Sequence, residues 1–218
     1  METAIALADE KGLAGVTMSA VASKLKVAAM SLYRYVGSKD ELLTMMADAA
    51  APVPPVQGEL GWREYVVVWT RAQLDHLRGR PWTLDIPRTG PPSGPSELRW
   101  LEAMLRALEA TGLSVGERFN IAIALSGYAF AQAKLVHDLA TPAQSASEEF
   151  ASSAGYAAML SAVLDERDYP ILTSLARVDD FGSWKEWVRD PDFGFGLNLL
   201  CAGVESLIER SSGPRSAP

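Results

Sequence analysis

A chain of 218 residues, 48% of them hydrophobic, is long enough to form one or two compact domains with their own cores. Its formal net charge of −7 argues against a protein that binds nucleic acid over its whole surface. The single cysteine, Cys201, excludes an internal disulfide framework and cannot supply a thiolate metal site by itself.

The start of the chain carries acidic residues where a secretory signal peptide would carry basic ones. No stretch of about 18 apolar residues stands out, and a membrane-spanning helix requires about that length. We therefore expect a cytoplasmic protein with no membrane partner.

Apolar residues follow helical spacing through most of the chain, and no alternating strand pattern competes, so we predict an all-α protein. The first helix is expected over residues 3–11, ending at Gly12, and the second over 18–25 with Thr17 as its N-cap. A short helix over 30–36 follows. Ser38 and Glu41 then form a capping box, S-x-x-E, which opens a helix that ends near residue 50.

The Pro- and Gly-rich segment 51–61 is predicted to separate two domains, over residues 1–50 and 51–218. In the second domain, Ser96 and Ser114 are expected to cap helices. The helices are predicted over residues 62–77, 96–111, 114–139, 148–165, 169–178 and 193–210. The loop 81–95 is expected to hold a single turn near residues 82–85.

Residues 18–36 have the layout of a helix-turn-helix, whose second helix lies in the major groove of DNA. Leu32 and Val36 would bury one side of that second helix. A small basic face is possible if four residues point the same way: Lys24, Lys26, Arg34 and Lys39. The spacing alone does not establish a DNA-binding motif, because short amphipathic helix pairs are common in all-α proteins.

The run VTMSAVASKLKVAAMSLYRYVGSKDELL, residues 16–43, carries a more specific pattern. It closely resembles the DNA-binding segment of the tetracycline-repressor (TetR) family, most distinctively in its ending L-Y-x-Y-V-x-S-K-x-E-L-L. The resemblance covers about residues 4–50. Residues 81–114 and the ending FGLNLLCAGVESLIER resemble the C-terminal domain of that family more loosely.

The resemblance implies a three-helix helix-turn-helix domain followed by a larger helical domain for ligand binding and dimerisation. It implies a homodimeric transcriptional repressor that binds a palindromic operator and leaves it when a small, mainly hydrophobic effector binds. By the same resemblance Tyr33 and Lys39 hold backbone phosphates, and Thr17 and Met18 sit at the N-terminus of the first helix of the motif. The positions facing the groove are Ala28, Ala29, Met30, Ser31, Arg34 and Tyr35.

Three positions depart from the family pattern. Lys26 stands where the family usually has glycine, at a turn expected to need a left-handed backbone, and a non-glycine residue there costs on the order of 1 kcal/mol. Ala28 stands where a serine N-cap is common, and Ser19 replaces a frequent base-contacting residue. We expect the fold to tolerate these changes, because tertiary packing stabilises short helices.

A ligand-sensing domain should enclose an apolar cavity with a few polar groups. The residues that we select as ligand contacts are Trp69, Gln73, His76, Trp100, Met104, Leu105, Asn120 and Tyr128. The resemblance places Trp69, Gln73, Met104 and Leu105 near ligand-contacting positions. The alternative for each residue is that it only packs the core.

Dimerisation is expected through the long helix 114–139 and the last helix 193–210, which by the resemblance form a four-helix bundle with their mates. The last helix has an apolar stripe made of Leu197, Leu200, Cys201, Val204, Leu207 and Ile208. The alternative is that this stripe packs within its own chain.

No cofactor, metal site or enzymatic activity is expected, since His76 and His137 are the only histidines and no H-x-x-x-H motif occurs. Two other functions remain open. One is an all-α carrier of apolar ligands, or a small enzyme, without DNA binding. The other is a regulator, such as an activator, whose C-terminal domain only dimerises.

Overall fold

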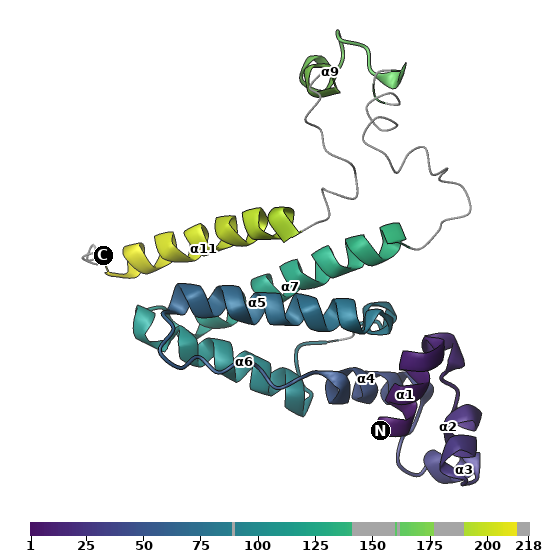
Figure 1. Ribbon diagram of the computed structural model, residues 1–218. Helices are drawn as coiled ribbons and strands as arrows, with labels where there is room; N and C mark the ends of the chain where they lie inside the picture. Colours follow the sequence, from purple (N-terminus) through teal and green to yellow (C-terminus); the bar gives the residue numbers. More distant parts are fainter. Residues whose placement is uncertain (89, 141–159, 161, 177–189, 213–218) are drawn as a thin grey trace. The chain divides into compact units, whose positions relative to one another are not determined.

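The computed structural model describes residues 1–88, 90–140, 160, 162–176 and 190–212, and the elements in this part of the chain are all helical (Figure 1). The chain forms two compact units, one of residues 1–133 with 201–218 and one of residues 134–200. The all-α prediction is confirmed. The helix expected over 148–165 lies largely outside the described residues.

The N-terminal part consists of α1 (Glu2–Lys11), the 3-10 turn η1 (Leu13–Gly15), α2 (Met18–Leu25), α3 (Ala29–Leu32) and α4 (Lys39–Ala50). Its core gathers small and medium apolar side chains from α1, α2 and α4, with Val16 and Met46 completely buried. The expected caps are present, because Thr17 Oγ1 accepts a hydrogen bond from Ala20 N at 3.0 Å and Ser38 Oγ accepts one from Glu41 N at 3.1 Å. The helix expected over 30–36 is shorter and ends at Leu32.

The turn between α2 and α3 adopts the backbone expected from the sequence. Lys26 has φ 55° and ψ 40°, the left-handed conformation, and it is the single non-glycine residue with positive φ among those described. Its backbone N–H still bonds to Ser23 O at 3.1 Å, so the end of α2 is closed. Ala28 at the start of α3 supplies no side-chain cap, as its methyl group predicts.

The rest of the chain contains α5 (Trp62–Gly79), the 3-10 turn η2 (Pro81–Asp85), α6 (Pro95–Ala107), the 3-10 turn η3 (Glu109–Thr111), α7 (Val115–Ala140), α9 (Pro170–Ala176) and α11 (Asp190–Ser212). The turn near residues 82–85 and the cap at Ser114 are confirmed, since Ser114 Oγ accepts from Glu117 N at 3.3 Å. The expected cap at Ser96 is wrong. Gly94 occupies the N-cap position of α6, and Ser96 Oγ instead accepts from Arg99 Nη2 at 3.1 Å.

The N-terminal helices and the α5–α6 region belong to the same compact unit. Trp82 and Ile86 join the buried core of α1, α2 and α4. Trp82 Nε1 donates to Asp9 Oδ1 at 2.7 Å, and Arg80 Nη1 donates to Ala50 O at 2.8 Å. The helix-turn-helix is thus attached to the next part of the chain by side-chain packing and hydrogen bonds as well as by the linker. A domain boundary at residue 50 remains a proposal.

Candidate functional site

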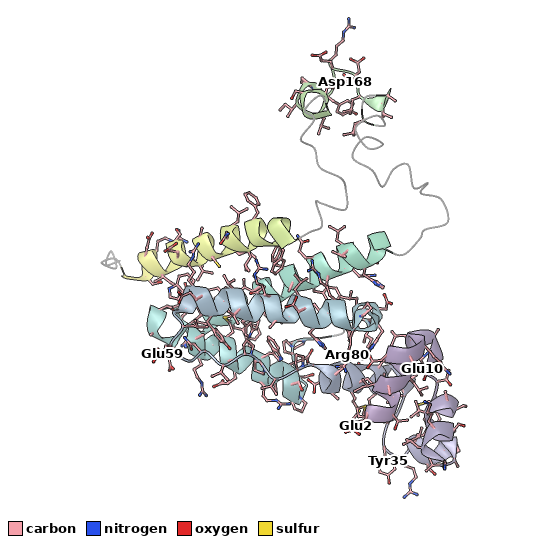
Figure 2. All side chains as sticks on the ribbon, viewed as in Figure 1. Glu2, Glu10, Tyr35, Glu59, Arg80 and Asp168 are labelled. Atoms are coloured by element: carbon pink, nitrogen blue, oxygen red, sulfur yellow. The ribbon has the colours of Figure 1, made fainter. Side chains whose placement is uncertain are left out.

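The short helix α3 and the residues just after it present several large side chains to solvent. Met30 is 75% exposed and Tyr35 is 80% exposed, and Tyr33 and Arg34 are also exposed. Figure 2 shows Tyr35 at the outer side of the α2–α3 segment. Val36 turns inward and is buried, so the segment has one face in the core and one face open to a partner.

Lys39 is exposed at the first position of α4. Glu41 reaches back past the N-cap Ser38, because its Oε2 accepts from Gly37 N at 2.7 Å, so only the Ser38 half of the expected capping box is formed. The partial positive charge of a helix N-terminus adds to the lysine charge, which suits a phosphate group.

The cations near α3 are available to a partner. Lys24 lies 3.6 Å from Glu10, an ion pair on the surface. Within the described residues, Lys26, Arg34 and Lys39 have no carboxylate at ion-pair distance. These three exposed cations remain as candidates for the basic face expected from the sequence, and that they share one side of the motif stays a prediction.

The other residues predicted to contact DNA differ in their exposure to solvent. Thr17 and Ala28 are exposed, and Ala29 and Ser31 are half-buried. Met18 differs from the expectation, because its side chain is 7% exposed and belongs to the core. For Met18 only the backbone amide in the first turn of α2 remains as a candidate phosphate contact.

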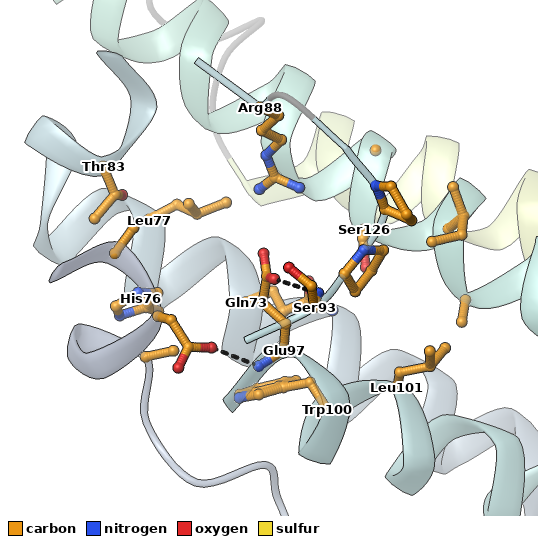
Figure 3. Close-up of a pocket in the computed structure, with 18 of the residues that line it drawn as sticks. Gln73, His76, Leu77, Thr83, Arg88, Ser93, Glu97, Trp100, Leu101 and Ser126 are labelled. Atoms are coloured by element: carbon orange, nitrogen blue, oxygen red, sulfur yellow. Dashed lines mark hydrogen bonds between the residues drawn. The ribbon is translucent and has the colours of Figure 1, made fainter. Parts of the chain in front are cut away.

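The second feature is a cavity of about 650 Å³ whose walls come from α4, α5, the loop before α6, α6 and α7 (Figure 3). Trp69 and Trp100 form part of the apolar wall, with ring centroids 5.6 Å apart in an edge-to-face arrangement. Both indole N–H groups are already used, since Trp69 Nε1 donates to Trp100 O at 3.1 Å and Trp100 Nε1 donates to Pro52 O at 2.7 Å. The tryptophans thus present apolar ring surface to the cavity.

Four of the eight predicted ligand contacts line this cavity: Trp69, Gln73, His76 and Trp100. Four others do not: Met104, Leu105, Asn120 and Tyr128. Met104 is completely buried in the protein interior, and Asn120 is exposed. On α7 the lining residues follow helical spacing from Phe119 to Gly127, and Tyr128 lies on the opposite side of the helix.

Sequence reasoning missed the contribution of α4 and of the loop before α6. Thr44, Ala47 and Asp48 line the cavity from α4, and Arg88 and Ser93 line it from the loop. The α4 residues recur at spacings of three and four, which marks one helix face but does not say what the face meets. The loop has no periodicity at all, so its inward residues could not be found from the pattern.

Two polar side chains that line the cavity, Gln73 and His76, are of interest for ligand binding. Gln73 Nε2 is buried and has no hydrogen-bond partner. Burial, and then the positive charge of Arg80, lower the pKa of His76 below its usual value, which favours the neutral imidazole at neutral pH. An unpaired buried amide is costly, so a ligand oxygen that accepts from Gln73 would be favoured.

Asp48 of α4 caps the first turn of α6. Its Oδ1 accepts from both Ser96 N and Glu97 N at 2.9 Å. Glu97 Oε2 accepts from Ser93 N at 3.0 Å and from Gly94 N at 3.2 Å. A Cβ atom at Gly94 would collide with the Asp48 carboxylate, so this junction requires glycine at position 94. The helix that follows the DNA-binding motif is thereby hydrogen-bonded to a wall of the cavity.

The apolar stripe proposed for dimerisation is largely used within the chain. Leu197, Cys201 and Val204 are buried, and Leu200, Leu207 and Ile208 are half-buried. Burial also raises the pKa of the Cys201 thiol. Other apolar side chains on the same two helices are exposed instead: Ile123 and Leu135 on α7, and Phe195 and Leu199 on α11. Ile123 also lines the cavity, so if these helices pair with a second copy, Leu135, Phe195 and Leu199 are the better candidates for the contact.

The helix α7 also corrects the expectation that no apolar stretch of membrane-spanning length exists. Residues 115–138 have a mean hydropathy of 1.2 and are long enough to cross a membrane by length and composition alone. A core helix of a soluble protein meets the same criterion, so one such helix is weak evidence for a membrane span. No group of three or more potential metal ligands occurs among the residues that the structure describes.

Comparisons with known proteins bear on both features. Residues 1–46 match the family described as bacterial regulatory proteins, tetR family, and residues 54–208 match the tetracyclin repressor-like C-terminal domain. A relative from Streptomyces coeruleorubidus, HTH-type transcriptional repressor DrrR1, is 32% identical over 225 residues, which cover 100% of this chain and 80% of the relative. The chain belongs to the tetracycline-repressor family of transcriptional regulators.

Solved structures agree with this membership. The TetR family protein ActR of Streptomyces coelicolor in complex with (S)-DNPA has a TM-score of 0.71 and 26% identity, with 94% of each chain covered. Apo ActR has a TM-score of 0.72 at 24% identity, with 97% of this chain and 96% of that chain covered, and shows the shared fold. This TetR-family chain is a transcriptional repressor, and neither a carrier nor an enzyme is favoured, because the relatives are regulators.

Proposed function

We propose that two copies of this chain bind a palindromic operator through Tyr33, Arg34 and Lys39, and that a small, mainly hydrophobic effector in the cavity lowers their affinity for DNA. Family membership supports DNA binding, and the exposed cations beside α3 supply its chemistry. Regulators of this kind are soluble DNA-binding proteins, and we place this one in the cytoplasm.

One observation carries the proposal: α4 begins with Lys39, a proposed DNA contact, and also forms part of the cavity wall. An occupant that contacts Thr44, Ala47 or Asp48 acts directly on the helix that begins with Lys39. A ligand shifts an equilibrium only by its difference in affinity for two states. The junction between Asp48 and α6 offers such a difference, because the two backbone hydrogen bonds depend on the relative position of α4 and α6.

Related proteins support the role of the cavity. Crystal structures of ActR from Streptomyces coelicolor contain (S)-DNPA or actinorhodin, so a relative with this fold binds small organic molecules. In this chain the cavity volume of about 650 Å³ falls in the range of ordinary small-molecule sites, about 300–1,000 Å³. The tryptophan rings favour a flat apolar ligand.

The experiment begins with selection of duplexes from a random pool by the full-length protein. The dissociation constant of the selected duplex is then measured at several salt concentrations, alone and with candidate hydrophobic compounds. We expect affinity to fall steeply with salt, and an effector to release the duplex. An affinity for duplex DNA that is absent, or that does not respond to salt, would favour the carrier or enzyme.

Two leucines on α6 provide a matched pair for the effector step. Leu101 lines the cavity and Leu105, one turn later, does not, and both are half-buried. Leu101→Ala should weaken the response to the effector and leave DNA affinity without effector unchanged, whereas Leu105→Ala should leave both unchanged. If both variants respond equally to the effector, the effector does not bind in this cavity.

A further inference from the structure

Arg88 brings a positive charge to the cavity. It belongs to the loop between η2 and α6, and Figure 3 shows its guanidinium directed into the space that Gln73, Ser93 and Ser126 also line. The guanidinium carbon lies 4.4 Å from the centroid of the Phe130 ring on α7. That contact holds the side chain against the wall through a cation–π attraction.

The charge of Arg88 has no direct counter-ion. Among the described residues, no carboxylate lies at ion-pair distance from its guanidinium. Burial lowers the pKa of Arg88, and the more weakly acting charge of Glu97 raises it. Arginine nevertheless stays protonated in proteins, so the desolvation remains as an unfavourable energy that a bound anion would relieve.

Two carboxylates, Asp48 and Glu97, also line the cavity and would repel an anion. Both are already engaged at the start of α6, where each accepts two backbone N–H groups (dashed lines in Figure 3 mark two of these bonds). The positive end of the helix dipole offsets their charge there. Arg88 approaches from the loop and has no such partner.

The other polar groups of the cavity also favour a ligand that accepts hydrogen bonds. Gln73 Nε2 is a buried donor without an acceptor. His76 is favoured as the neutral imidazole, so it adds no second cation at neutral pH. The donors that await an acceptor are thus a guanidinium and an amide, set against the rings of Trp69 and Trp100.

We propose that the effector of this protein is an organic acid, with a flat apolar body against Trp69 and Trp100 and a carboxylate or similar anion held by Arg88. Gln73 donates a hydrogen bond to an oxygen of the same molecule. This inference rests on the proposed function, since it specifies the chemistry of the effector for that cavity. A planar guanidinium binds a carboxylate through two parallel hydrogen bonds, which also fixes the orientation of the ligand.

The test uses three probes with one flat body: anthracene-2-carboxylate, its neutral carboxamide and the cationic 2-(aminomethyl)anthracene. Binding to the full-length protein is followed by quenching of tryptophan fluorescence. The acid should bind at least about tenfold more tightly than the amide, the ratio typical of a charge-assisted hydrogen bond. The amine should bind most weakly.

Variants separate charge from packing. Arg88→Gln should bind the acid and the amide equally while its affinity for the amide is unchanged, and Arg88→Lys should keep part of the preference for the acid. Arg106→Gln is the control, because Arg106 lies on α6, outside the cavity, in a surface ion pair with Glu102. This control should behave like the unaltered protein.

Several results would overturn the inference: equal binding of acid and amide by the unaltered protein, tightest binding of the amine, or an equal loss for both probes in Arg88→Gln. If the amide releases operator DNA without any preference for the acid, the proposed function stands and the acidic effector fails. If none of the three probes binds, the acidic flat effector fails, while the proposed function is decided separately by operator binding and its release by other hydrophobic compounds.

Discussion

At the scale of single residues, Lys26 shows how the motif tolerates a departure from its usual sequence. Its left-handed backbone, φ 55°, is closed by the hydrogen bond to Ser23 O, and its side chain is exposed. Lys26→Gly should therefore raise the free energy of unfolding by up to about 1 kcal/mol in urea denaturation. Lys24→Gly, inside α2, is the matched control and should lower it by about 1 kcal/mol. A loss of stability in both variants would contradict this account of the turn.

Tyr33, Arg34 and Lys39 should contribute differently to DNA binding. Lys39→Ala and Tyr33→Phe remove phosphate contacts, so they should weaken binding almost equally for all sequences, and Lys39→Ala should reduce the salt slope by about one unit. Arg34→Ala should change the preferred sequence, because a guanidinium reads guanine edges. Fluorescence anisotropy with a panel of duplexes measures both effects. Titrations unchanged in all three variants would refute these roles.

At the scale of elements, the α4–α6 junction depends on a single carboxylate. Asp48→Ala removes the acceptor of two backbone N–H groups and should lower the free energy of unfolding by about 1 kcal/mol, a typical cost of losing an N-cap. Asp48→Asn keeps an acceptor oxygen and should lose less. If the junction transmits the effector response, Asp48→Ala should also reduce release of DNA by the effector. If the effector still releases DNA fully from Asp48→Ala, the junction between Asp48 and α6 does not transmit the effector response.

The exposed apolar residues of α11 are suited to a partner helix. Leu199 is 61% exposed, so an aspartate there should be tolerated within one chain but not in an apolar interface. Leu199→Asp should shift the mass in light scattering toward that of one chain, 23.5 kDa. Leu98→Asp, at an exposed leucine on α6, should not change the mass. A dimer that persists in Leu199→Asp would exclude this face.

The helices and caps of the N-terminal part were predictable because local signals specify them. Thr17 and Ser38 cap the helices as their side chains predict, whereas Glu41 bonds to Gly37 N instead of Ser38 N, and the left-handed turn at Lys26 follows from the glycine expected there. The start of α6 was missed because its cap comes from Asp48, 48 residues before Ser96. Of the eight residues predicted as ligand contacts, four line the cavity, and all four lie on helices. Helical spacing could not place Arg88, which reaches the cavity from an irregular loop.

At the scale of the molecule, the DNA-binding motif and the cavity are connected within one compact unit. Trp82 donates to Asp9, Arg80 to Ala50, and Trp100 to Pro52, so the last turn of α1, the end of α4 and the linker after it are hydrogen-bonded to the α5–α6 region. We propose that these partly buried contacts carry small shifts of the cavity wall to the motif. We expect effector binding to move α4 together with the motif that it follows.

Sedimentation of the protein with its selected duplex tests the central claim most directly, because a palindrome read by two α3 segments requires two chains. The account predicts a complex that contains twice the 23.5 kDa of one chain per duplex, and that separates when the effector is added. A complex with a single chain, or a protein that sediments apart from every duplex, would contradict it.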